Sequence, residues 1–148
     1  MSSRRQTTGE DYPDAALKHC DDARHLLSAN RPDGAAYLAG YAVECMLKTV
    51  IQVESSNSDP VRTWKHHLNN LSTEAMRLAA LPSNKTARYL THPSITTLPY
   101  SNPPSGWKEY LRYYPSGTIP TPTAEQWVGE AERLYLEVIG ELQKDGEL

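Results

Sequence analysis

The sequence predicts an all-α protein, an antiparallel four-helix up-and-down bundle with a long proline-rich connection before its last helix. Apolar residues recur at helical spacing in four segments, at residues 13–28, 34–53, 67–81 and 123–142. No segment shows the apolar–polar alternation of a strand. Eight of the eleven prolines fall between Pro82 and Pro122, so long helices cannot persist there. At 148 residues the chain fits a single domain, 1–148, with its core over about 13–145.

The first two segments predict a helical hairpin. Pro13 suits the first position of a helix that runs to Ser28, and Asp14 favours the positive end of its dipole. The expected inward stripe of this helix is Ala16, Cys20, Ala23 and Leu27. The run Asn30-Arg31-Pro32 breaks the helix, and Asp33 is expected to cap a second one that extends to about Val53. Because the connection is short, the two helices should pack antiparallel.

The second helix is apolar on nearly every side. Between Gly34 and Ile51 the only formal charges are Glu44 and Lys48, which lie one turn apart on the same face. We therefore expect this helix at the centre of the bundle, with four residues buried between the other helices: Ala39, Val43, Met46 and Val50. A carboxylate at such a place needs a partner or a role. Glu44 and Lys48 are interpreted as structural polar residues, and the alternative for Glu44 is a catalytic base.

The remaining helices follow weaker signals. The third is expected to begin near His66 or His67 and to end at Leu81-Pro82, with Leu68, Leu71, Ala75 and Leu78 as its stripe. A short helical turn is expected around residues 107–112. The last helix is expected to begin at Thr123, where Thr123-Ala124-Glu125-Gln126 has the pattern of a capping box. Its expected inward residues are Trp127, Ala131, Leu134, Val138 and Leu142, and its expected outward residues are Glu130, Glu132, Glu137 and Glu141.

Composition argues against several kinds of site. Cys20 and Cys45 are too few for a disulfide framework and form no Cys-x-x-Cys, so both are expected to be buried free thiols. We expect no metal and no cofactor, because the glycines are scattered and adjacent histidines are poorly spaced as ligands on a helix. No apolar run reaches the roughly 18 residues of a membrane span, and no signal region follows Met1, so the expected location is the cytoplasm.

Charge is distributed unevenly along the chain. The net charge is −3 over residues 1–59, +5 over residues 60–112 and −5 over residues 113–148. Tryptophans and tyrosines lie among the basic residues of the middle segment, a mixture that suits phosphate contact with base stacking. The candidate RNA- or nucleotide-binding residues are Arg62, Lys65, Arg88, Arg112 and Tyr113. The alternative is that these charges are solvated, that the rings belong to the core, and that Arg112 pairs with a carboxylate such as Glu44.

Three segments carry a family resemblance. They are Ala35-Ala36-Tyr37-Leu38-Ala39-Gly40-Tyr41-Ala42-Val43-Glu44-Cys45-Met46-Leu47-Lys48, His67-Leu68-Asn69-Asn70-Leu71 and Trp107-Lys108-Glu109-Tyr110-Leu111-Arg112-Tyr113. In this order the chain resembles the HEPN (higher eukaryote and prokaryote nucleotide-binding) family over about Ala15 to Leu142. The resemblance implies a small helical protein that usually forms a homodimer. Many relatives are metal-independent ribonucleases of toxin–antitoxin or defence systems, and others are inactive binding modules, often paired with a minimal nucleotidyltransferase.

The chain departs from the family at the catalytic motif. Active relatives carry Arg, four to six residues and then His near the start of the last core helix, whereas here no histidine follows His92. The resemblance therefore implies a module that binds RNA, nucleotide or a partner protein without the standard ribonuclease site, so catalysis is not expected. The alternative is a divergent metal-independent endoribonuclease toxin that uses Arg62, His66 or His67, with Arg112. A third interpretation is a structural subunit that masks a nucleotidyltransferase.

Overall fold

The computed structural model describes residues 9–55, 65–81 and 106–148, and within them the protein is an all-α bundle, as predicted. Its long helices are α1 (Tyr12–Ser28), α2 (Pro32–Glu54), α4 (Leu68–Ala79) and α5 (Thr121–Leu134). A 3₁₀ turn, η2 (Glu109–Tyr113), stands at the expected short helical segment. After α5 the last helix continues through a π-helical turn, η3 (Tyr135–Gly140), into α6 (Glu141–Lys144).

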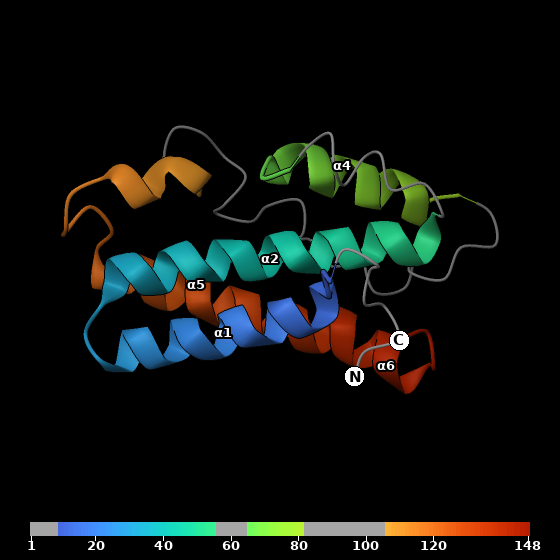
Figure 1. Ribbon diagram of the computed structural model, residues 1–148, viewed down its shortest axis with the longest axis horizontal. Coiled ribbons are helices and arrows are strands. Elements are labelled where there is room, and N and C mark those ends of the chain that lie inside the picture. Colours follow the sequence, from blue (N-terminus) through green and yellow to red (C-terminus); the bar gives the residue numbers. More distant parts are fainter. Residues whose placement is uncertain (1–8, 56–64, 82–105) are drawn as a thin grey trace.

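Helix α2 is the central element of the bundle. It contacts α1, α4, α5 and η2, and Figure 1 shows it between α1 on one side and α4 with η2 on the other. Its near absence of charge explains this position, because no face of it requires water. Ala39, Val43, Met46 and Val50 are all buried, which confirms the prediction for this helix. The stripes predicted for the third and last helices are buried in the same hydrophobic cluster.

The helix directions differ from the alternation predicted for an antiparallel up-and-down bundle. α1 and α2 form the predicted antiparallel hairpin, whereas α4 and α5 run in the same direction as α2 (Figure 1). Contacts agree with this arrangement: His66, two residues before α4, reaches Glu44 in the middle of α2, and the residues before α5 reach Asp33 at the start of α2. The connections over residues 55–67 and 80–120 are long enough to return along the bundle before the next helix begins.

Two of the predicted helix caps are wrong. Asp33 does not cap α2, because Pro32 already occupies the first helical position; its carboxylate instead accepts the backbone N–H groups of Gly117 and Ile119, both at 2.8 Å. The capping box at Thr123 is also absent, since α5 begins two residues earlier at Thr121 and has no side-chain cap. By contrast, Asp11 caps α1 by accepting the N–H of Asp14 at 3.2 Å.

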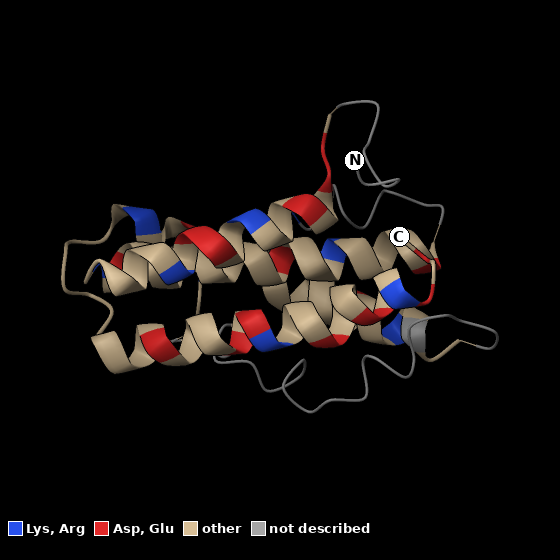
Figure 2. Cartoon of the chain, turned by 90° about the horizontal axis from the view of Figure 1, so that it is seen from below, with Lys and Arg blue, Asp and Glu red and all other residues tan. Residues whose placement is uncertain are grey.

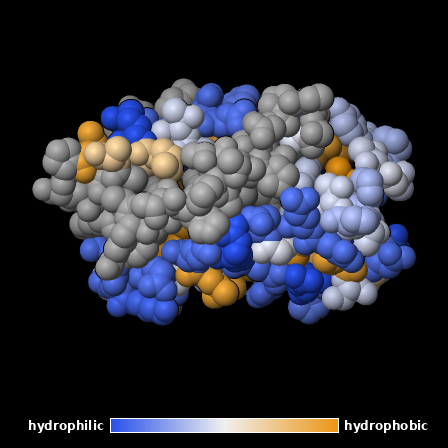
Figure 3. Space-filling view, turned by 180° about the vertical axis from the view of Figure 1, so that it is seen from behind, coloured by the Kyte–Doolittle hydropathy of each residue, from blue (hydrophilic) through white to orange (hydrophobic). Residues whose placement is uncertain are grey.

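The outer surface of the last helix is held by ion pairs. Arg133 pairs with Glu130 and Glu137, Arg24 of α1 pairs with Glu132, and Lys144 pairs with Glu141. Figure 2 shows acidic residues spaced along this helix with basic residues between them. Where it is described, the face seen from behind is largely hydrophilic, with hydrophobic atoms in small separate patches (Figure 3). Among the described residues, no helix has the length and apolar character that crossing a membrane requires.

Candidate functional groove

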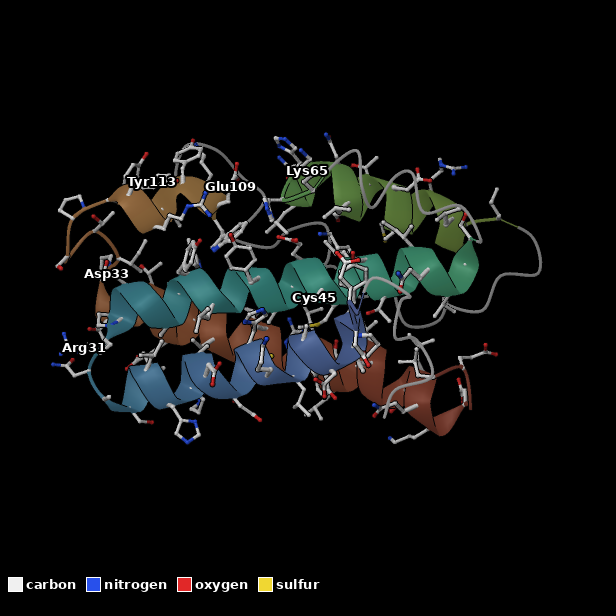
Figure 4. The ribbon with its side chains drawn as sticks, viewed as in Figure 1. Arg31, Asp33, Cys45, Lys65, Glu109 and Tyr113 are labelled. Carbon is white, nitrogen blue, oxygen red and sulfur yellow. The ribbon has the colours of Figure 1, made fainter. Side chains whose placement is uncertain are left out.

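A groove of about 350 Å³ opens where the start of α4 approaches the start of η2. We call it the α4–η2 groove; both of these elements lie along the same side of α2 (Figure 1). It is lined by two segments that are far apart in the sequence, residues 66–70 and 106–110. The first supplies two imidazoles and two side-chain amides, and the second supplies a lysine, a carboxylate and two aromatic rings. Figure 4 shows Glu109 on η2 and Lys65 just before α4.

A buried carboxylate lies behind this groove. Glu44 is 3% exposed and accepts hydrogen bonds from Lys48 Nζ at 2.6 Å and from His66 Nδ1 at 2.9 Å. Lys48 is also buried, with its ammonium 5.3 Å from the centre of the Tyr12 ring. Two donors from different elements compensate the cost of burying the carboxylate. The predicted polar pair of Glu44 and Lys48 thus gains a third member, His66, that connects α2 to the start of α4.

His66 is held in one orientation by these contacts. Its Nδ1–H donates to Glu44, and its ring packs edge-on against Tyr41 with ring centres 5.5 Å apart. Its side chain is 40% exposed and lines the groove. A histidine whose Nδ1 is bound to a carboxylate keeps its Nε2 available as a proton acceptor or donor. The neighbouring His67 is the N-cap residue of α4 and is exposed, without a side-chain capping bond.

The other wall of the groove depends on Trp107 and Gly40. Trp107 is 3% exposed, and its indole N–H donates to the carbonyl of Tyr37 at 2.9 Å. Its ring stacks against Tyr37 and packs edge-on against Tyr41. A Cβ at Gly40 would lie 2.1 Å from the indole nitrogen, so only glycine permits this approach. In the sequence, the sign of this contact is a lone glycine inside an apolar helix, a pattern that indicates close packing.

Arg112 makes tyrosine contacts, not the alternative pair with Glu44. Its guanidinium hydrogen-bonds the side chains of Tyr113 and Tyr37, which raises its pKa above the ordinary value. It also lies 4.9 Å from the centre of the Tyr113 ring. The interpretation of Arg112 as Glu44's partner is therefore wrong, because Lys48 and His66 already occupy that carboxylate. Beneath Arg112, burial and the 3.0 Å contact with the Tyr37 hydroxyl raise the pKa of Tyr41.

The predicted binding residues are only partly brought together. Lys65, His66 and His67 stand together at the start of α4, and Arg112 and Tyr113 stand on η2, where both are exposed. Arg62 and Arg88 lie outside the described residues. Six other polar or aromatic residues of the groove were not among the predicted site residues: Asn69, Asn70, Trp107, Lys108, Glu109 and Tyr110. Trp107, Lys108 and Tyr110 belong to the basic, aromatic middle segment, and all six residues belong to the two segments that resemble one family, but neither signal shows that the two segments meet.

Within the described part of the chain, no cluster of three or more His, Cys, Asp or Glu side chains could hold a metal ion. Comparison with protein-family models, with curated proteins and with solved structures finds no match. The HEPN resemblance, the homodimer and the nucleotidyltransferase partner therefore stay predictions that rest on the residues quoted above.

Proposed function

We propose that the α4–η2 groove binds RNA or a nucleotide and that the protein is a HEPN-like binding module without the standard ribonuclease site. The observation that supports this most is the meeting of two distant segments that join cationic, amide and aromatic side chains in one groove. Lys108 lines the groove and supplies positive charge for phosphate, and the exposed Lys65 directly precedes the lining residue His66 in the chain. The Tyr110 ring at its rim offers a surface for base stacking.

The start of α4 adds to the support for an anionic ligand. Its N-cap, His67, makes no side-chain capping bond, and the first residues of the helix, Leu68 to Asn70, line the groove, so their backbone N–H groups have no capping side chain. Such N–H groups favour phosphate oxygens, and the positive end of the helix dipole also favours a negatively charged ligand. On η2, Arg112 and Tyr113 extend the same combination of guanidinium and exposed ring away from the groove.

The test is fluorescence anisotropy with a labelled single-stranded RNA in the presence of a chelator. Lys108→Ala should weaken binding, because it removes a cation at the rim of the groove. Lys144→Ala is the matched control, since it removes the same charge from the far end of the last helix. Absence of RNA binding to the wild type even at low salt contradicts the proposal, and the groove would then dock an acidic partner protein.

The second candidate is the divergent metal-independent endoribonuclease. It is favoured by the 2.9 Å contact between Glu44 and His66, which fixes an imidazole at the groove. In RNA cleavage such an imidazole takes the proton of the ribose 2′-hydroxyl, while cations stabilise the charge on the phosphate. Lys65 and His67 would stand beside the phosphate in this candidate, with Arg62 and Arg112 as the further residues predicted for it. Wild-type cleavage of RNA in chelator, lost in His66→Gln and His67→Ala, would establish it over the binding module.

The family resemblance adds a proposed homodimer in a toxin–antitoxin or defence setting, with a nucleotidyltransferase as the possible partner of the module. Two aromatic side chains at the end of η2 support a partner surface, since Tyr113 is 74% and Tyr114 is 50% exposed. Sedimentation equilibrium at tens of micromolar protein tests the dimer. A single species at the mass of one chain, 16.6 kDa, would contradict it.

A further inference from the structure

We propose that the α4–η2 groove selects guanine, with the carboxylate of Glu109 accepting both N1–H and the N2 amino group of the base. This inference rests on the proposed binding of RNA or nucleotide and adds the identity of the base. The observation behind it is a carboxylate on the wall of a groove whose other charged residues are basic.

Glu109 is out of place in a site built for phosphate alone. It stands at the first position of η2, on the wall opposite Asn69 and Asn70 of α4. Among the described residues, no side chain forms an ion pair or hydrogen bond with Glu109. Its carboxylate therefore does not neutralise a described basic neighbour. A carboxylate near a bound phosphate weakens binding by like-charge repulsion unless it meets a donor on the same ligand. The donor groups of a nucleotide are on its base.

The chemistry of the four bases singles out guanine. An ionised carboxylate is an acceptor only, with two oxygens side by side. Guanine alone presents two adjacent donors, N1–H and the N2 amino group, on its Watson–Crick edge. Adenine and cytosine present one amino donor beside an acceptor nitrogen, and uracil presents one N–H between two carbonyl oxygens. Only guanine therefore satisfies both oxygens of Glu109 without placing an acceptor against a carboxylate.

The remaining lining suits the same base. The side-chain amides of Asn69 and Asn70 can donate to a carbonyl such as O6 from the opposite wall. Tyr110 is 39% exposed at the rim and can stack on the flat face of the base. A volume of about 350 Å³ is small for a binding pocket and fits one unpaired nucleotide better than a duplex.

The experiment compares labelled pentanucleotides, UUGUU, UUAUU, UUCUU and UUUUU, by fluorescence anisotropy with the wild-type protein. UUGUU should bind about tenfold more tightly than the other three, the discrimination expected of one good bidentate contact. Inosine at the centre, which lacks the N2 amino group, should lose part of this preference. 1-Methylguanosine, which lacks the N1–H, should lose all of it.

Two variants complete the test. Glu109→Gln keeps the shape but replaces one acceptor by a donor, so the preference for UUGUU should fall below about twofold. Glu125→Gln, an equal charge change on the exposed side of α5, should keep it. Equal wild-type affinity for all four RNAs, or a uniform gain in Glu109→Gln with an unchanged ratio, overturns the guanine assignment and leaves RNA binding standing. Failure of every RNA to bind overturns the proposed function itself.

Discussion

At the residue scale, the buried carboxylate of Glu44 lies between an ammonium and an imidazole. Its contacts with Lys48 and His66 join two successive turns of α2 to the segment just before α4. Removing the negative charge would leave the Lys48 ammonium buried without a counterion. The stability of this part of the bundle should therefore depend on the pair more than on either residue alone.

Glu44→Gln should destabilise the protein by about 3–5 kcal/mol in denaturant unfolding, the cost of breaking a buried ion pair from one side. The double variant Glu44→Gln with Lys48→Met should recover part of this loss, because it also removes the unpaired charge. A double variant that is less stable than the sum of both single changes would contradict the buried pair.

The two cysteines give a second prediction at this scale. Burial raises the pKa of both thiols to about 12, and Cys20 and Cys45 are 4% and 7% exposed. Because the thiolate is the reactive form, neither should react with a thiol reagent at about pH 8 in the native state. Both should react in concentrated guanidinium chloride. An added Ser116→Cys, at an exposed position, should react at once and serves as the positive control.

At the element scale, the contact between α2 and the segment before η2 depends on a single glycine. Gly40→Ala would place a methyl group where the Trp107 ring lies. The ring would have to move, and the wall of the groove would shift with it. The variant should lose about 1–3 kcal/mol of unfolding free energy and weaken ligand binding to the groove.

Whether a glycine-to-alanine change lowers or raises the unfolding free energy distinguishes a packing clash from a gain in helix propensity. In α5, Gly129 has open space where a Cβ would stand, so Gly129→Ala should stabilise the protein by up to about 1 kcal/mol. If Gly40→Ala also stabilised the protein, the close approach of Trp107 to α2 would be wrong.

Element types and buried stripes could be predicted because they follow from local periodicity, as the buried Leu68 and Leu71 of α4 show. Caps were predicted less well, because a capping residue can be recruited elsewhere. Asp33 has the right chemistry for a cap, but it binds the N–H groups of Gly117 and Ile119, about 85 positions along the chain. Helix direction after a long connection also has no local signal, and the parallel course of α4 and α2 was not predictable.

At the scale of the whole molecule, the candidate groove exists only after the chain has folded. His66 and His67 were chosen from the sequence as a cluster, and Trp107 to Tyr113 as part of a family resemblance. Their meeting depends on Glu44 and Gly40, which hold the two segments over the same face of α2. Such a site is a tertiary property, and single-sequence patterns carry no direct signal for it.

Charge is the other whole-molecule property, and it leads to a prediction about salt. The middle of the chain carries +5 and the segment after it carries −5, so a nucleic acid should bind the middle segment and avoid the acidic last helix. Affinity for single-stranded RNA should fall steeply as salt rises, because each phosphate contact releases condensed counterions. Arg112→Ala should weaken binding and reduce the slope of log affinity against log salt by about 0.7, the value for one phosphate of a single strand.

Arg24→Ala removes the same charge from the exposed surface of α1, away from the groove, and should leave the slope unchanged. If the two variants change the slope equally, the interaction responds to net charge alone, and Arg112 does not contact a phosphate.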